Sequence, residues 1–163
     1  MKITLGIRTV ETAVLYFEKT NCEIFRKVLP QKAKTREEAV ADFYASQRPG
    51  AASFGQTIYA DERHIGDIWC YCIDYSGPVN AMVSYCVFEP TFWGKGVATQ
   101  ALRLFLPEIT QRYGLDVIGA FTYADNLPSI RVLEKTGFRL LENFTEDGIA
   151  SCYFQLDLHP KEM

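Results

Sequence analysis

Residues 82–113 read MVSYCVFEPTFWGKGVATQALRLFLPEITQRY, a strand-like run followed by a glycine loop and an amphipathic segment. Apolar residues recur at helical spacing over residues 97–113, which predicts a helix directly behind the loop. Gly94 and Gly96 let backbone amides approach a ligand. The helix N-terminus presents unpaired N–H groups and a partial positive charge. The junction therefore predicts a cradle for a pyrophosphate group.

Neither of two familiar nucleotide motifs fits this junction. Gly94-Lys95 is followed by Gly96, so the P-loop pattern is missing, and Gly94-x-Gly96-x-x-Thr99 lacks the third glycine of the dinucleotide fingerprint. Dinucleotide folds also place the glycine loop early in a parallel βαβ unit, whereas the strands expected before this loop form an antiparallel meander. Glycines that only permit a tight strand-to-helix turn remain an alternative explanation.

Hydropathy patterns predict the elements around the junction. Before it we expect a strand near residues 3–7 and one helix from Val10 to Leu29-Pro30 with an interruption at Thr20-Asn21. A helix capped by Thr35 and Glu38 then runs to about Gln47. Strands follow at residues 57–60, 64–74 and 80–88. After it we expect a strand at residues 116–122, a helix at 128–135 ended by Gly137, and a hairpin of residues 138–144 and 150–158 around Asp147-Gly148.

These elements predict a single α/β domain over residues 1–163. We expect a mixed sheet of about seven strands flanked by about four helices. The antiparallel strands come first in the chain, and a central parallel pair is splayed to admit a cofactor.

Composition limits the function classes. The chain is 48% hydrophobic and 23% charged, which is typical of a globular domain. Its formal net charge of −3 argues against a nucleic-acid partner and is compatible with a cationic amine substrate. Residues 1–8 lack the pattern of a signal peptide and no stretch approaches membrane-spanning length, so no membrane partner and a cytoplasmic location are expected.

Cysteine and histidine usage predicts no metal site. The chain has five cysteines without CxxC spacing and two distant histidines, of which His64 is expected at a strand edge. Four cysteines fall in strand-like apolar runs, where we expect buried, reduced thiols: Cys70, Cys72, Cys86 and Cys152.

The junction resembles the coenzyme A loop of the GNAT superfamily, [Q/R]-x-x-G-x-[G/A], with Trp93 in place of the Gln or Arg. Gly66-Asp67, Asn126-Leu127-Pro128-Ser129 and residues 133–138 (LEKTGF) are similar to the branch that contains the ribosomal-protein N-terminal acetyltransferases. The resemblance covers residues 64–158 and implies a GNAT-like fold and acetyl transfer from acetyl-coenzyme A to a primary amine. We expect direct attack in a ternary complex, because no Cys or Ser stands beside a histidine that could activate it. A protein or peptide N-terminus and a small amine both remain open as acceptors.

The resemblance also implies roles for individual residues. A backbone N–H of Val87 or Phe88 would hold the thioester carbonyl. Asn126 would bond the pantetheine arm, and Ser129 would protonate the thiolate, because Leu133 stands where many members carry a tyrosine. Capping of the helix is the alternative for Asn126 and Ser129. The pyrophosphate would be bound by the amides of Gly94, Lys95, Gly96, Val97, Ala98 and Thr99, with Lys95 either adding charge or remaining solvated.

The general base stays open. Glu142 and Glu146 lie in the hairpin where the ribosomal-protein enzymes place an acidic base, and Glu89 and Asp67 compete with them. Glu146 is disfavoured because it adjoins a turn that is expected to be solvated. A chain of water molecules is a further alternative.

Three further alternatives remain. Tyr85 or Tyr123 could replace Ser129 as the acid. A catalytically inactive coenzyme A-binding regulatory module would keep the cradle but lack turnover. An exposed edge strand and the hydrophobic C-terminal hairpin would suit a homodimer, with a monomer as the alternative.

Overall fold

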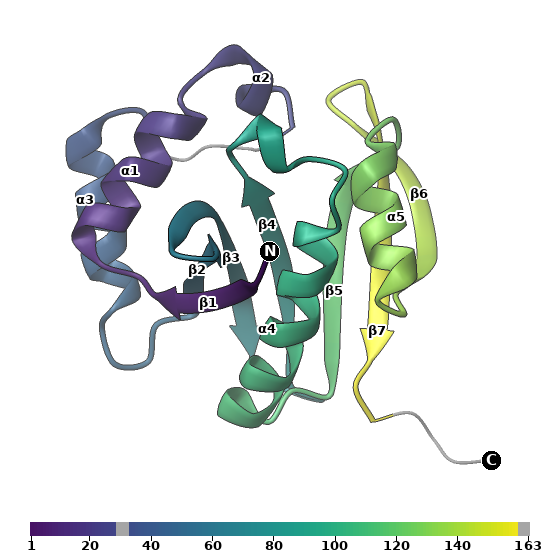
Figure 1. Cartoon of the computed structure of the whole chain (residues 1–163). Helices are drawn as coiled ribbons and strands as arrows, with labels where there is room; N and C mark the ends of the chain where they lie inside the picture. Colours follow the sequence, from purple (N-terminus) through teal and green to yellow (C-terminus); the bar gives the residue numbers. More distant parts are fainter. Residues whose placement is uncertain (29–32, 160–163) are drawn as a thin grey trace.

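The strands form one mixed sheet in the order β1-β2-β3-β4-β5-β7-β6 (Figure 1). The computed structural model describes residues 1–28 and 33–159. Its strands are β1 (Ile3–Ile7), β2 (Phe54–Ala60), β3 (Arg63–Asp74), β4 (Asn80–Val87), β5 (Val117–Tyr123), β6 (Arg139–Glu146) and β7 (Ile149–Asp157). All neighbouring pairs are antiparallel except β4 and β5. The mixed sheet and its antiparallel first half are as predicted.

The described residues contain five α-helices instead of about four. They are α1 (Val10–Thr20), α2 (Glu23–Arg26), α3 (Arg36–Ser46), α4 (Val97–Tyr113) and α5 (Leu127–Lys135), and a short 3-10 helix, η1 (Pro90–Phe92), precedes the glycine loop. The predicted first helix is divided because the backbone leaves helical geometry at Asn21, with φ −81° and ψ 59°. Its predicted end at Leu29-Pro30 lies outside the described residues.

Local sequence signals set most element ends. The Thr35 side chain caps α3 by accepting a hydrogen bond from the Glu38 N–H. The Glu38 carboxylate accepts from the Lys34 N–H instead of the Thr35 N–H that a capping box would use. Gly114 and Gly137 take left-handed backbone geometry behind α4 and α5, as expected. The β6–β7 hairpin turns at Asp147 and Gly148, both with positive φ.

The parallel pair is splayed, as predicted. The pairing of β4 with β5 covers only Asn80–Met82 against Val117–Gly119. Beyond Met82, β4 continues beside β3, whereas β5 continues beside β7. The backbone groups of residues 83–87 that face β5 therefore lie along an opening in the sheet.

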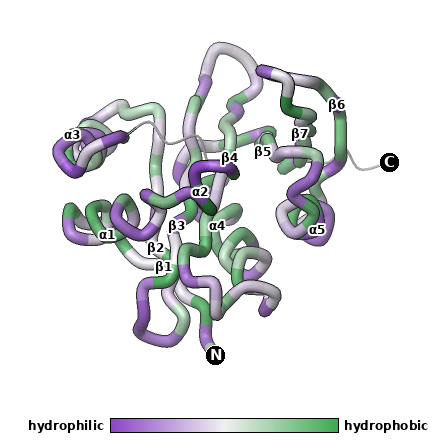
Figure 2. The backbone as a smooth tube through the Cα atoms, turned by 90° about the horizontal axis from the view of Figure 1, so that it is seen from above, coloured by the Kyte–Doolittle hydropathy of each residue, from purple (hydrophilic) through white to green (hydrophobic). Residues whose placement is uncertain are grey.

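Helices cover the two faces of the sheet unequally (Figure 2). On the side of α4 and α5, called here the α4 face, Val83, Ile118 and Phe154 pack against Leu102 and Phe105 of α4. This is the main core, and the α4 face is closed by it.

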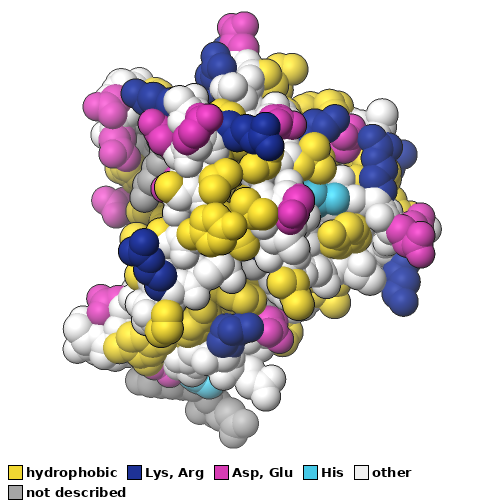
Figure 3. Space-filling model, turned by 90° about the vertical axis from the view of Figure 1, so that its left-hand side faces the viewer, with side chains coloured by type: hydrophobic (Ala, Val, Ile, Leu, Met, Phe, Trp, Pro, Cys, Tyr) yellow, Lys and Arg dark blue, Asp and Glu magenta, His cyan; other side chains and the backbone are white. Residues whose placement is uncertain are grey.

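On the opposite side, called here the α1 face, Phe25 of α2 packs on Cys86 and Phe88 of β4, and Tyr16 of α1 contacts Trp69 edge to face. Figure 3 looks at the side of the molecule where α1 and α3 lie and shows hydrophobic side chains gathered in the middle of it, with charged side chains around them. The helices thus cover the β3 and β4 part of the α1 face.

The cysteine prediction is partly wrong. Cys70, Cys86 and Cys152 are buried, but Cys72 is exposed, because the register of β3 and β4 shifts after Tyr71 and turns Cys72 outward with φ 53°. In residues 1–28 and 33–159, no helix combines the length and the hydropathy needed to cross a bilayer. The same residues hold no cluster of three or more His, Cys, Asp or Glu side chains that could bind a metal ion.

Candidate active site

The glycine loop forms an open cradle at the N-terminus of α4. Gly94 and Gly96 have φ of 74° and 77°, and a Cβ added at either would meet nothing within 4 Å. Gly96 caps α4 without any side-chain hydrogen bond, and the first turn carries no acidic residue. Its amides are thus not capped by a side chain in the described structure and carry the positive end of the helix dipole. The arrangement fits a pyrophosphate.

The structure brings all six predicted cradle residues together, with different exposures. Gly94, Lys95 and Gly96 are exposed, whereas the side chains of Val97 and Thr99 are buried under the loop, so these two offer only backbone amides. The Lys95 Nζ lies 5.7 Å from the ring centroid of Phe92, at the mouth of the cradle.

Only one of the two predicted thioester-binding amides faces the opening between β4 and β5. The Phe88 N–H donates to the Ile65 carbonyl of β3 at 2.9 Å, so it is used within the sheet. Because successive N–H groups of a strand point to opposite sides, the Val87 N–H faces the β5 side. The Val87 carbonyl faces the same side and accepts from the Trp93 Nε1–H at 2.8 Å.

Ser129 meets Tyr85 on the α4 face, although 44 residues separate them in sequence. Their hydroxyl oxygens lie 3.2 Å apart. The Asn126 Oδ1 accepts from the Ser129 N–H at 3.4 Å and so caps α5. Burial raises the pKa of Tyr85 to about 12, against a smaller lowering by the Ser129 hydrogen bond. Tyr85 therefore stays protonated at neutral pH.

Tyr123 and Leu133 lie outside this pair. Strand alternation places Tyr123 on the α1 face, opposite Ser151 in the β5–β7 register. Leu133 is 1% exposed and belongs to the main core. Of the alternative acids, the structure thus brings Tyr85 alone beside Ser129.

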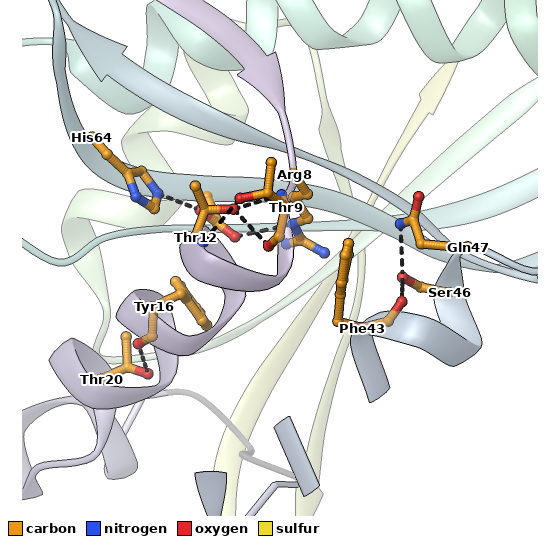
Figure 4. Close-up of polar contacts among 10 residues, drawn as sticks. Arg8, Thr9, Thr12, Tyr16, Thr20, Phe43, Ser46, Gln47 and His64 are labelled. Atoms are coloured by element: carbon orange, nitrogen blue, oxygen red, sulfur yellow. Dashed lines mark hydrogen bonds and ion pairs between the residues drawn. The ribbon is translucent and has the colours of Figure 1, made fainter. Parts of the chain in front are cut away.

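Two of the four candidate bases are held in ion pairs. Glu89 bridges Lys19 of α1, at 3.3 Å, and Arg63 of β3, at 3.2 Å. Asp67 is 1% exposed and lies between Arg8, at 3.0 Å, and His64, at 2.8 Å. Figure 4 shows Arg8 and His64 of this network beside the first turn of α1. Glu89 thus connects α1 to the sheet, and Asp67 connects Arg8, just before α1, to the sheet.

The burial of His64 was missed by sequence reasoning. His64 does lie at the start of β3, as expected for an edge position, but its side chain is only 8% exposed. Ile58 pairs with Gly66 and Tyr59 pairs with His64, so Ile65 is an extra residue and β3 bulges there. The bulge puts His64 on the same face as Asp67, three residues away.

Glu142 and Glu146 are exposed, and neither has an ion-pair partner in the described part of the chain. They share the α1 face with Phe144, because all three alternate along β6. Strand β7 separates them from β5, which places them about 10 Å from that strand. The structure does not bring either carboxylate to Ser129.

The α1 face is open and aromatic over β5, β7 and β6. Phe121 is 55% exposed, and its ring centroid lies 5.8 Å from Phe144 and 5.2 Å from Tyr153. A hollow of about 230 Å³ adjoins this cluster and is lined by Met82, Gly119 and Tyr153, among others. Gly119 keeps it open, because a Cβ there would lie 2.7 Å from the Tyr153 ring.

Comparison with known proteins finds acetyltransferases among the relatives of this chain. Residues 5–139 match the family model described as the acetyltransferase (GNAT) domain. Over 123 residues the chain is 28% identical to the uncharacterized N-acetyltransferase YnaD of Bacillus subtilis (strain 168), a match that spans 76% of this chain and 71% of YnaD.

Solved structures share the fold. The aminoglycoside acetyltransferase AAC(6')-Ib in complex with coenzyme A has a TM-score of 0.81 at 16% identity, over 97% of this chain and 96% of the other. Mycobacterium smegmatis RimJ in complex with CoA-disulfide has a TM-score of 0.81 at 18% identity, over 96% of this chain and 82% of RimJ. Identities this low establish the common architecture alone.

Proposed function

The chain belongs to the acetyltransferase (GNAT) domain family, and from this membership we propose that it transfers the acetyl group of acetyl-coenzyme A to a primary amine. The observation that carries the proposal is the open glycine cradle at the uncapped N-terminus of α4, beside the splayed pair of β4 and β5. We assign the activity to a single domain over residues 1–163.

The proposed cosubstrate site runs from the cradle to the opening in the sheet. Amides of the glycine loop and of the first turn of α4 bind the pyrophosphate, and Asn126 bonds the pantetheine arm. The Val87 N–H donates to the thioester oxygen and stabilises the negative charge that develops there during attack. Acetyl-coenzyme A supplies the activated acyl group, and the residues of this chain orient it.

Ser129 is the proposed acid. The amine attacks the carbonyl carbon, the carbon–sulfur bond breaks, and the Ser129 hydroxyl gives its proton to the departing thiolate. Tyr85 stands behind Ser129 at 3.2 Å and can return a proton to it. The raised pKa of Tyr85, about 12, keeps this second proton in place at neutral pH.

The acceptor approaches from the α1 face. Ser129 and Tyr85 meet on the α4 face, so the amine has free access to the opening only from the other side. The exposed ring of Phe121 packs with Phe144 and Tyr153 on the face that also carries Glu142 and Glu146, whose carboxylates have no ion-pair partner among the described residues, and this combination favours a cationic amine. We propose that the amine proton leaves through water towards these carboxylates, since Glu89 and Asp67 are held by cations.

A reducing, cytoplasmic compartment is part of the proposal. Cys22 and Cys72 are free and exposed, and exposed free thiols are typical of proteins that work under reducing conditions.

The first test is thermal unfolding with acetyl-coenzyme A, with NADH and ATP as controls. At a hundredfold excess over Kd, selective binding to the native state stabilises it by about 2.7 kcal/mol. For a chain of this size, that raises Tm by about 5–10 °C. No shift with saturating acetyl-coenzyme A would contradict the proposal.

The second test is release of free thiol with graded amines. Butylamine, 1,4-diaminobutane and a peptide with a free N-terminus separate a monocationic, a dicationic and a peptide acceptor. Turnover is expected to be fastest with an acceptor that keeps a second positive charge. Binding of the cosubstrate without turnover of any amine would favour a regulatory module instead.

A further inference from the structure

Trp93 connects the glycine loop to β4 and to α2. It begins the glycine loop, its Nε1–H donates to the Val87 carbonyl of β4 at 2.8 Å, and its ring meets Phe25 of α2 edge to face at 6.1 Å. Phe25 is 6% exposed, so this contact is anchored in the small core of the α1 face. The indole is therefore held from two directions, although 47% of Trp93 is exposed.

The bonded carbonyl belongs to the residue whose N–H faces the opening between β4 and β5. Both polar groups of Val87 point to the β5 side, where β4 has no ladder partner beyond Met82. Without a donor, the carbonyl would turn a partial negative charge towards the place proposed for the thioester oxygen. The Trp93 N–H occupies this carbonyl and leaves the N–H as the free polar group of Val87.

We propose that Trp93 is a positioning residue for acetyl transfer. Its indole N–H holds the Val87 carbonyl and so fixes the backbone of Val87 with the N–H directed at the thioester oxygen. The inference rests on the proposed function. Trp93 touches no reacting atom and acts through Val87.

Two substitutions distinguish the effect of the Trp93 indole N–H from the effect of its ring contact with Phe25. Trp93→Phe removes the N–H but keeps an aromatic ring against Phe25. Phe25→Leu keeps the N–H but removes the ring contact. Loss of one hydrogen bond that orients a transition-state donor is expected to lower kcat about tenfold in Trp93→Phe. Phe25→Leu is expected to keep kcat within about threefold, and the Kd for coenzyme A is expected to stay within about threefold in both.

Either of two results would overturn the inference. One is an unchanged kcat in Trp93→Phe. The other is a loss in Phe25→Leu as large as in Trp93→Phe, which would assign the effect to packing. Unfolding midpoints measured on both variants show whether each is folded at the assay temperature.

A spectroscopic measurement reports, without turnover, on the hydrogen bond that the cosubstrate's carbonyl accepts from Val87. The probe is a methyl-ketone analogue of acetyl-coenzyme A, with CH2 in place of sulfur and ¹³C at the carbonyl. A hydrogen bond from Val87 moves the carbonyl resonance downfield on binding to the wild-type protein, and Trp93→Phe is expected to reduce this shift. Equal shifts in both proteins, or no shift in either, overturn the inference. Failure of the wild type to bind the analogue would instead contradict the proposed function.

Discussion

The Tyr85 hydroxyl lies 3.2 Å from the Ser129 hydroxyl, so β4 and α5 meet at two groups that can carry a proton. The contact crosses the opening between the splayed strands on the α4 face. Ser129 alone is a weak acid, but a neutral tyrosine behind it supplies a replacement proton. The pair is thus a better candidate acid than either hydroxyl alone.

Ser129→Ala is expected to lower kcat by about a hundredfold, the lower end of the range for general acid catalysis. Tyr85→Phe is expected to lower kcat less, and the double variant to lose little more than Ser129→Ala, because both act on one proton. Stopped assays of thiol release measure the three values. Tyr44→Phe, at an exposed tyrosine of α3, is the matched control and should keep wild-type kcat. Additive losses would contradict a shared proton.

Gly96→Ala is expected to weaken acetyl-coenzyme A binding at least about tenfold, because its Cβ fills the open cradle where the pyrophosphate is proposed to lie. Gly50→Ala is the matched control. Both glycines have φ +77° and open space around an added Cβ, so both variants carry the same backbone strain, about 1–2 kcal/mol. Calorimetric titration and chemical unfolding separate the two effects. Equal affinity in both variants would remove the cradle from the proposed site.

Much of the fold was predictable because its signals are local. The glycine junction, the helix behind it and the Asp147-Gly148 turn are each encoded within a few residues, and the structure confirms them. Alternating and helical periodicities located the other elements to within a few residues. The beginning of β2 was missed by three residues, because Phe54, Gly55 and Gln56 do not carry the β-branched pattern that identified Thr57 onward.

The candidate site was less predictable, because its contacts are long-range. Nothing near Tyr85 in sequence indicates that its hydroxyl meets Ser129, since this depends on where α5 packs across the sheet. The burial of His64 depends on one extra residue in β3, and alternation alone cannot locate such a bulge. The ion pairs of Glu89 and Asp67 join distant elements in the same way, so the sequence could not show which of the candidate carboxylates are held by cations.

Gly66→Ala is expected to destabilise the protein by about 1–3 kcal/mol and to lower kcat. A Cβ at Gly66 would lie 2.3 Å from the Cys86 carbonyl oxygen and 3.0 Å from the Val87 Cα, and backbone atoms cannot give way without moving β4. The Val87 N–H would move with the strand. Urea unfolding and steady-state kinetics measure the two effects.

The control for that substitution is Gly77→Ala, in the turn between β3 and β4. An added Cβ at Gly77 meets nothing within 4 Å, so stability and kcat should both stay close to wild type. If Gly66→Ala behaved like Gly77→Ala, close packing of β3 on β4 would not be what positions Val87.

Stability is expected to fall as pH rises above about 9, because buried thiols must stay protonated in the native state. Burial raises the pKa of Cys86 to about 12 and that of Cys70 to about 11, from 9.0 for an unperturbed thiol. Above pH 9.0 the unfolded chain releases these protons and the native chain does not, so ionisation favours unfolding. The stabilisation is complete below that pH and is lost progressively as pH rises towards the native pKa values. Each thiol contributes a slope of up to about 1.4 kcal/mol per pH unit.

Urea unfolding at pH 8, 9 and 10 measures this slope. Cys86→Ala should make it shallower, since one of the two thiols no longer titrates. Val83→Ala, a truncation in the same strand without a titrating group, should lower stability equally at every pH and keep the wild-type slope. Because Cys86 packs with Phe25 and Phe88 beneath α2, a slope that did not change in Cys86→Ala would mean that water reaches this small core. That result would also argue against the inference that Phe25 anchors the ring of Trp93.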